Sequence, residues 1–347
     1  MDKFARTAHA LLHNCKQQAD PNFASTLPRP LVRRESDFFR PLDMEQIPAE
    51  WICGPTDPDF YHRFLSGQLS KEECRLIGFR EQTHRPELIR RTVLEVAGTV
   101  LTAQLAVLYG LAGHVAGGTH HAHPKGGAGY TILNDLAIAT HVLTEQSSKQ
   151  QSCNSEDIAM DSLVDISIQR KINRVLVIDC DVHQGDGTAK FMLVPCLQGK
   201  LATLSLHCAS NYPQPKAQST YDIGLPDSMH DSNYLQILRD SVNLALSEVQ
   251  PDLVLYDAGV DIYKGDTLGR LNVSEQGIRQ RDRWVLERCV KAGIPVAGVI
   301  GGGYDKNVDA LARRHAILHE ECSFVWRKYK MWERPAWREL VAGLPAS

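Results

Sequence analysis

The sequence lacks the features that mark several large classes of protein. Its nine cysteines are an odd number, widely spaced, with no C-x-x-C pair. This predicts reduced thiols in an intracellular compartment rather than a disulfide framework or a zinc knuckle. No apolar run is expected to be long enough and free enough of charge to cross a bilayer. Residues 1–10 contain three charged side chains and no long apolar core, so no signal peptide is expected.

The chain also has no excess of positive charge. The formal net charge is −3 and no dense Lys/Arg run occurs, so we expect no direct binding to nucleic acid. A weak organelle-targeting interpretation of the first twenty residues stays open, although Asp2 and Asp20 count against it. The 347 residues are 43% apolar and 23% charged, which is ordinary for a soluble globular chain of one large domain or two small ones.

One stretch, residues 174–187, combines an apolar strand with side chains that can bind a metal ion. It opens with a β-branched apolar run, Val175 to Ile178, typical of a buried parallel strand. Asp179, Asp181 and His183 follow two residues apart, so on an extended chain they point to one face. A strand end whose acids bind backbone amides is the simpler interpretation. Three polar groups in register after a dry strand favour a metal site instead.

Strands and helices are predicted to alternate along most of the chain. Further strands are expected at 201–207, 253–256 and 294–300, separated by helices such as 234–249, 274–292 and 308–326. This alternation predicts an α/β fold with three layers, α/β/α, around a central parallel sheet. We divide the chain into an N-terminal arm of unclear structure (1–50), a catalytic domain (51–330) with an exposed polar insertion at 145–160, and a C-terminal tail (331–347).

The unusual polar residues all fall at the predicted carboxyl ends of strands. Those ends share one edge of a parallel sheet, so residues that are distant in the sequence can meet there. The residues concerned are His120, His121, Asp179, Asp181, His183, Asp186, Ser205, Asp261 and Tyr304.

Three of these residues suit a catalytic metal. Asp181, His183 and Asp261 offer two oxygens and one nitrogen, and three protein ligands with an open position are typical of a catalytic site. The absence of thiolates favours zinc or a similar ion such as iron(II).

The remaining groups suit hydrolysis of an amide or an ester. Adjacent histidines, His120 and His121, can act as acid and base if carboxylates orient them, and Asp179 and Asp186 are free to do so. Tyr304, on a glycine-rich hinge, can donate its hydroxyl to a developing oxyanion.

Four motifs in order resemble the zinc-dependent histone deacetylase family over about residues 55–320. They are Gly117-Gly-Thr-His-His-Ala122, Asp179-Cys-Asp-Val-His-Gln-Gly-Asp-Gly187, Ala258-Gly-Val-Asp261 and Gly301-Gly-Gly-Tyr304. Three further segments, Asp57-Pro-Asp-Phe60, Asn211-Tyr-Pro213 and Gly265-Asp-Thr-Leu-Gly269, resemble its class IV branch and related bacterial deacetylases.

The resemblance implies the arginase–deacetylase fold and a role for each residue. Zn²⁺, or Fe²⁺ as the alternative, would be held by Asp181, His183 and Asp261. His121 with Asp186 would be the general base and acid, His120 with Asp179 an electrostatic partner, and Tyr304 the oxyanion donor. Gly129, Tyr130, Tyr212 and Gly303 would line the substrate tunnel, and a structural K⁺ would bind at Asp179, Asp181, His183, Ser205 and Leu206.

The resemblance also implies the substrate and the setting. The substrate would be an acylated lysine of a histone or another protein, and the setting chromatin regulation in the nucleus or the cytoplasm. Two departures stand out: no Gly-His-Arg-Phe-Pro-like first segment is found in residues 1–50, and Tyr130 stands where the family usually has Phe. Two alternatives stay open: a deacylase of small acylated amines such as polyamines, and a non-catalytic scaffold.

Overall fold

The computed structural model describes residues 3–18, 32, 34–149 and 170–333. The described α-helices are α1 (Lys3–Gln18), α2 (Ala49–Cys53), α3 (Pro58–Leu65), α4 (Lys71–Ile77), α5 (Pro86–Tyr109), α6 (Asp135–Lys149), α7 (Asp186–Phe191), α8 (Asp231–Val249), α9 (Glu275–Lys291) and α10 (Val308–Lys328). The strands are β1 (Leu111–Gly113), β2 (Val175–Asp179), β3 (Leu201–Cys208), β4 (Tyr221–Leu225), β5 (Leu253–Asp257) and β6 (Val296–Val299). Short 3₁₀ turns are η1 (Glu35–Asp37), η2 (Met44–Gln46), η3 (Arg80–Gln82) and η5 (Met331–Glu333).

The strands form one six-stranded sheet in the order β1-β6-β5-β2-β3-β4, and every pairing is parallel. From β2 the chain builds outward through β3 and β4, then returns to place β5 on the other side of β2. This reversal opens a crevice at the carboxyl ends of β2 and β5, where ligands bind in open α/β sheets. The predicted central parallel sheet is confirmed.

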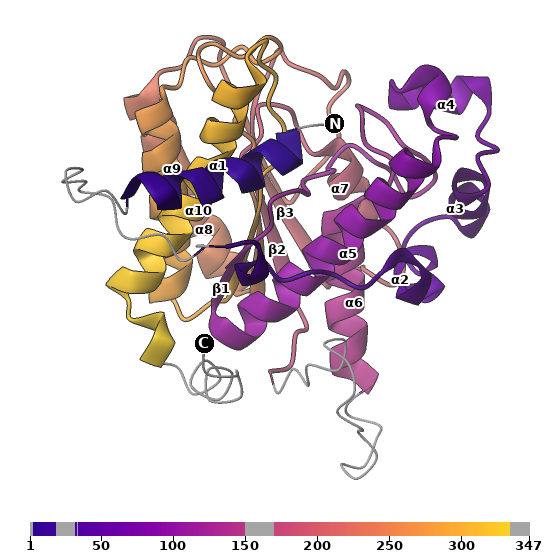
Figure 1. Ribbon diagram of the computed structural model, residues 1–347, viewed down its shortest axis with the longest axis horizontal. Coiled ribbons are helices and arrows are strands. Elements are labelled where there is room, and N and C mark those ends of the chain that lie inside the picture. The colour runs from indigo at the N-terminus through magenta and orange to yellow at the C-terminus, as the bar shows by residue number, and fades with distance from the viewer. Residues whose placement is uncertain (1–2, 19–31, 33, 150–169, 334–347) are drawn as a thin grey trace.

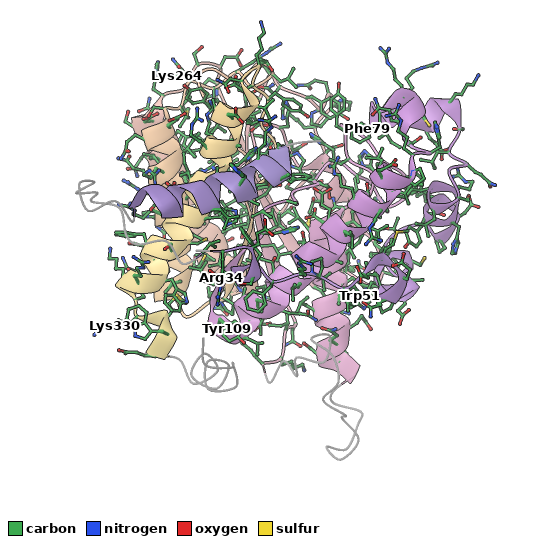
Figure 2. All side chains as sticks on the ribbon, in the orientation of Figure 1. Arg34, Trp51, Phe79, Tyr109, Lys264 and Lys330 are labelled. Atoms are coloured by element: carbon green, nitrogen blue, oxygen red, sulfur yellow. The ribbon has the colours of Figure 1, made fainter. Side chains whose placement is uncertain are left out.

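Helices cover both faces of the sheet (Figure 1). Leu176 and Ile178 of β2 pack with residues of α8, α9 and α10, whereas Val175 and Val177 pack with residues of α5 and α6. Because neighbouring residues of a strand point to opposite faces, an apolar run such as β2 contributes side chains to the cores on both faces of the sheet. Trp51 lies on the α5 side of the protein and packs against the second of these cores (Figure 2).

The two ends of the strands lie at opposite ends of the molecule. Tyr109, just before β1, and Lys264, beyond the carboxyl end of β5, mark them in Figure 2. All the predicted catalytic residues belong to the Lys264 end, because each follows a strand in the chain.

Two details of the sheet differ from the prediction. The strand β4 was not predicted, because Asp222 and Gly224 are residue types depleted in strands and β4 is an edge strand that alternates between inner and outer positions. β2 ends at Asp179, and the next residues form bends. Asp181 and His183 are therefore placed by a loop, and the period of an extended chain does not account for their positions.

Part of the predicted N-terminal arm folds as a helix against the domain. α1 packs against α10 (Figure 1), with Thr7 and Leu11 buried, so residues 3–18 form a helix docked on the domain. Arg6 forms an exposed ion pair with Asp309 of α10. Residues 19–31 and 33 lie outside the described part of the chain.

Helix α5 corrects the expectation that no run could cross a bilayer. By length and composition it passes that test, with a mean hydropathy of 1.5 in its most apolar window. In this structure 78% of that window is buried inside the protein, which is the position of a core helix. Its apolar side chains pack in the core on the α5 face of the sheet.

The predicted polar insertion at 145–160 begins later than expected. Residues 145–149 complete α6, and Ser147 is buried, its hydroxyl accepting from the N–H of Ile172 at 3.0 Å. The remainder, 150–160, lies outside the described residues. At the other terminus, Met331 of the predicted tail is buried, and 334–347 lie outside the described residues.

The start of α4 provides a test of local electrostatics. Ser70 and Glu73 form a capping box, and Glu73 also accepts two hydrogen bonds from Arg63 at 2.7 and 2.8 Å. These bonds lower the pKa of Glu73 from 4.5 to about 2. Because the carboxylate is favoured in the folded state, its contribution is complete above pH 4.5 and is lost as the pH falls toward 2.

We therefore expect Glu73→Gln to lower the free energy of unfolding by about 1 kcal/mol at pH 7, a value limited by partial exposure to solvent. The deficit relative to the wild type should shrink at pH 4. Urea unfolding of both proteins at the two pH values measures it, and a deficit that grows on acidification would contradict the assignment.

Candidate active site

A buried cluster of two carboxylates and one imidazole lies beyond β2 and β5. One ligand atom each of Asp181, His183 and Asp261 lies within 4.8 Å of the others. His183 Nδ1 lies 3.0 Å from Asp181 Oδ1 and 3.2 Å from Asp261 Oδ2. The N–H of Val182 donates to Asp261 Oδ1, and the N–H of Gly302 donates to Asp181 Oδ2, both at 2.8 Å. The second oxygen of each carboxylate is thus held by backbone.

The electrostatics of this cluster fit a cation. Burial and the charge of Asp181 raise the pKa of Asp261 to about 7. Burial alone would lower the pKa of His183, but its hydrogen bonds to Asp181 and Asp261 raise it to about 10. Two carboxylates buried this closely therefore need a positive charge between them, and the oxygen and nitrogen donors suit a divalent metal ion.

The histidine pair stands beside this cluster on the loop after β1. His120 Nδ1 lies 2.8 Å from Asp179 Oδ2, and His121 Nδ1 lies 2.7 Å from Asp186 Oδ1. The two rings are 4.1 Å apart between centroids, and both are buried. The structure thus brings together each histidine and the carboxylate that the resemblance assigned to it.

The two histidines have opposite electrostatic settings. Burial and the positive charge of His120 lower the pKa of His121 to about 4, against the opposing effect of Asp186. Burial would also lower the pKa of His120, but the nearby carboxylates, chiefly Asp179 and Asp181, raise it well above 6.5. One imidazole is therefore poised neutral and the other charged.

Tyr304 follows the glycine turn after β6. Its backbone N–H donates to Asp266 Oδ2 at 2.7 Å, and its carbonyl accepts from Thr267 at 3.1 Å. Burial and the charges of Asp181 and Asp261 raise the pKa of its hydroxyl. Asp266 also accepts from the N–H groups of Leu268 and Gly269, so it acts as the anchor of this turn.

Aromatic and glycine residues surround the His121 ring. A side chain at Gly129, where φ is +52°, would place its Cβ 2.5 Å from the ring, so glycine is required there. Tyr212 meets the ring edge-on at 4.9 Å and is 46% exposed; Tyr130 is 52% exposed and lies 6.2 Å from Tyr304. Gly129 and Tyr212 therefore border the His121 ring, and Tyr130 lies near Tyr304. Gly303 differs, because a Cβ there would point at Val260, Leu311 and His315, away from these aromatic rings.

The predicted K⁺ residues also lie together. Asp179 and Ser205 are register partners on β2 and β3, and Leu206 follows Ser205. The Ser205 hydroxyl lies 3.0 Å from His207 Nδ1. The N–H of Asp181 donates to Asp179 Oδ1 at 3.1 Å, which links this group to the cluster of Asp181, His183 and Asp261.

Two carboxylates that support the histidine loop were not predicted. Asp135, at the start of α6, accepts from the N–H groups of Gly118 and Thr119 at 3.0 and 2.8 Å. Glu95 of α5 accepts from the N–H of Gly117 at 3.2 Å. Glu95 could have been found from the sequence, because it is a carboxylate within the apolar stripe of α5. The sequence places Asp135 near a helix start, but nothing there indicates its reach back to the loop.

Gly78 and Phe79, also missed, support Tyr130. The Tyr130 ring packs on Gly78 so closely that a Cβ at residue 78 would lie 2.8 Å from it, and Phe79 meets the same ring edge-on at 6.0 Å. The N–H of Tyr130 donates to the carbonyl of Ile77 at 2.7 Å. The end of α4 therefore fixes one wall of the site, although α4 carries no residue that pattern reasoning would single out.

Comparison with known proteins identifies the family. The histone deacetylase domain matches residues 59–319. An uncharacterized protein of Picosynechococcus sp. is 42% identical over 282 residues, 81% of this chain and 84% of that protein. The chain therefore belongs to the histone deacetylase family, and it is a hydrolase of that family.

More distant relatives carry functional names. Histone deacetylase 2 of Arabidopsis thaliana is 29% identical over 61% of this chain, and the acetoin utilization protein AcuC of Staphylococcus aureus is 24% identical over 69%. The chain spans only 49% and 59% of the lengths of these two relatives.

Two solved structures share the fold. One is an acetylpolyamine aminohydrolase from Burkholderia pseudomallei, with a TM-score of 0.62 and 17% identity, covering 93% of this chain and 90% of that one. The other is an HDAC homolog complexed with SAHA, with a TM-score of 0.66 and 20% identity, covering 93% and 77%. At these identities the likeness establishes the arginase–deacetylase fold alone.

Proposed function

We propose that this chain removes acyl groups from the Nε atom of lysine side chains by metal-dependent hydrolysis of the amide. The observation that carries the proposal is the meeting of two unlike His–Asp pairs with the buried cluster of Asp181, His183 and Asp261. A scaffold has no need for such a constellation, whose buried charges cost stability.

Asp181, His183 and Asp261 would hold the metal, which we propose to be zinc, with iron(II) as the alternative of the same ligand preference. When bound, such an ion supplies Lewis acidity, which lowers the pKa of water and polarises a carbonyl group. The resemblance to the histone deacetylase family also supports a structural K⁺ at Asp179, Asp181, His183, Ser205 and Leu206. Asp179 and Ser205 of this set are register partners on β2 and β3.

His121 carries the proton transfers in this proposal. Its Nδ1 is bound to Asp186, so Nε2 is the atom that accepts a proton from the attacking water. Its low pKa keeps the imidazole neutral and ready to accept. The proton then passes from Nε2 to the departing lysine amine, which breaks the C–N bond and leaves a carboxylic acid.

His120 and Tyr304 stabilise the charge that develops on the carbonyl oxygen and around it. Carboxylates hold His120 in its charged form, so it contributes a fixed positive charge next to His121. The raised pKa of Tyr304 keeps its hydroxyl protonated, and a protonated hydroxyl can donate a hydrogen bond to an oxyanion.

Lysine is favoured over a polyamine as the substrate amine. Tyr130 and Tyr212 are exposed aromatic rings at the site, suited to pack along a methylene chain. A polyamine would gain from free carboxylates, but Asp186 is committed to His121 and Asp266 to three backbone N–H groups. Polyamine deacylation remains the second candidate, favoured by the fold shared with an acetylpolyamine aminohydrolase. From the resemblance of its sequence motifs to class IV deacetylases, we also propose that the chain belongs to that branch and acts in the nucleus or the cytoplasm.

Hydrolysis of matched substrates tests the proposal. We expect turnover of lysine peptides that carry acetyl, octanoyl or myristoyl groups, and we expect a zinc chelator to abolish it. Acetylated polyamines at equal concentration should give a lower kcat/KM. Preference for the polyamines would select the second candidate, and a metal-loaded protein that hydrolyses none of the panel would refute the deacylase proposal.

A further inference from the structure

The N-terminal helix reaches the active site through one side chain. Lys3 Nζ donates to the carbonyl oxygen of Gly301 at 2.9 Å, across 298 positions of the sequence. α1 packs against α10 (Figure 1), which begins shortly after the turn that contains Gly301 and Tyr304. The contact therefore joins α1 to the loop that carries the proposed oxyanion donor.

The carbonyl of Gly301 and the N–H of Gly302 belong to one peptide group. That N–H donates to Asp181 Oδ2 at 2.8 Å. Because a peptide group is planar, a donor that fixes its oxygen also fixes the direction of its N–H. The ammonium group of Lys3 and the carboxylate of Asp181 thus bind opposite ends of the same rigid unit.

The same turn is packed tightly against the histidine loop. The N–H of Gly301 donates to the carbonyl of Gly117 at 3.2 Å, and a Cβ at Gly118 would lie 2.6 Å from Gly301 Cα. At Gly301, where φ is +60°, a Cβ would lie 2.1 Å from Asp257 Oδ1. Since no side chain fits at Gly301, the orientation of this part of the turn depends on hydrogen bonds to its backbone.

The charges around Lys3 match this role. Glu95, which holds the N–H of Gly117, faces Lys3 and also pairs with Arg91 at 3.3 Å. Burial lowers the pKa of Lys3, and Glu95 opposes that shift most strongly. Arg91 is already engaged by Glu95, so Lys3 is the cation that reaches the Gly301 carbonyl.

We propose that Lys3 is a positioning residue that orients the Gly301–Gly302 peptide group toward Asp181 and thereby sets both metal affinity and turnover. The inference rests on the proposed function only for its effect on turnover. Its effect on the metal site follows from the link between Lys3, the peptide group and Asp181.

Lys3→Met removes the donor and keeps a similar length of side chain. We expect the Kd for Zn²⁺ to rise and kcat to fall by about tenfold each, the effect of losing one charge-assisted hydrogen bond, with KM unchanged. The visible absorption spectrum of the Co²⁺-loaded protein should also change. Zn²⁺ titration, Co²⁺ spectra and steady-state kinetics measure these effects, with any affinity tag placed at the C-terminus.

Two matched variants separate positioning from simple docking of the helix. Lys3→Arg keeps a donor and should restore kcat and the Zn²⁺ Kd to within about threefold of wild type. Arg6→Ala breaks the exposed ion pair between α1 and Asp309 and should leave both quantities near wild type.

Wild-type values in Lys3→Met would overturn the inference, as would equal losses in Lys3→Arg or Arg6→Ala. Circular dichroism and thermal unfolding identify any variant that fails to fold. If the wild type hydrolyses no substrate of the panel, the deacylase proposal fails. The comparison of Zn²⁺ affinities then decides the role of Lys3 by itself.

Discussion

Replacing His121 with alanine is expected to lower kcat by roughly 10³- to 10⁴-fold, because one group serves as both base and acid in the proposed reaction. The metal should still bind, since the cluster of Asp181, His183 and Asp261 does not include His121. Steady-state kinetics on an acetyl-lysine peptide and metal analysis of the same preparation measure the two expectations together.

His123 provides the matched control for this variant. It lies on the same loop, and its Nε2 is 3.4 Å from Asp186 Oδ2, so it shares the carboxylate that orients His121. His123→Ala should retain most of the activity. Near wild-type turnover in His121→Ala, or equal losses in both variants, would remove His121 from the mechanism and leave the shared carboxylate as the important group.

Much of the sheet and the catalytic set could be predicted, because the information is local. The apolar run of β2 predicts a buried strand, and Asp181 and His183 follow shortly after it. Because the carboxyl ends of parallel strands lie at one edge of a sheet, Asp261 can be predicted to lie near Asp181 and His183. Helix starts such as Ser70 with Glu73 were likewise predictable, because the capping box is formed within one turn.

The parts that escaped prediction depend on contacts between distant segments. Nothing in the sequence around Lys3 indicates that its ammonium group contacts Gly301. The loop that carries Asp181 and His183 is fixed by hydrogen bonds from the N–H groups of Val182 and Gly302, and the two-residue period of a strand does not describe it. Lys3, near the N-terminus, reaches the turn before Tyr304. Local patterns identify the reacting groups, whereas their supports come from tertiary packing.

Removing the metal should abolish hydrolysis, and adding Zn²⁺ back should restore it with a strong dependence on pH. Binding requires neutral His183 and ionised Asp261, whose pKa values in the metal-free protein are about 10 and about 7. Below pH 7 both groups must release a proton, so affinity should rise about 100-fold per pH unit; above pH 7 only His183 does, and the rise should fall to about tenfold. Zn²⁺ titrations against a competing chelator from pH 6 to 8 measure the slope.

Asp261→Asn separates the two protons. Asparagine has no proton to release, so the variant should bind Zn²⁺ weakly, with a slope of at most about tenfold per pH unit. Loss of the Asp261 carboxylate also lowers the pKa of His183, which can only flatten the slope further. The raised pKa of Asp261 also predicts that the metal-free wild type loses stability as the pH rises from 3.8 toward 7, because the unfolded chain gives up that proton first. Zn²⁺ should therefore raise the melting temperature more at pH 8 than at pH 6. An affinity that does not change with pH would mean that Asp261 and His183 are already in their ligating forms without the ion, and that the buried carboxylates are neutralised by other groups.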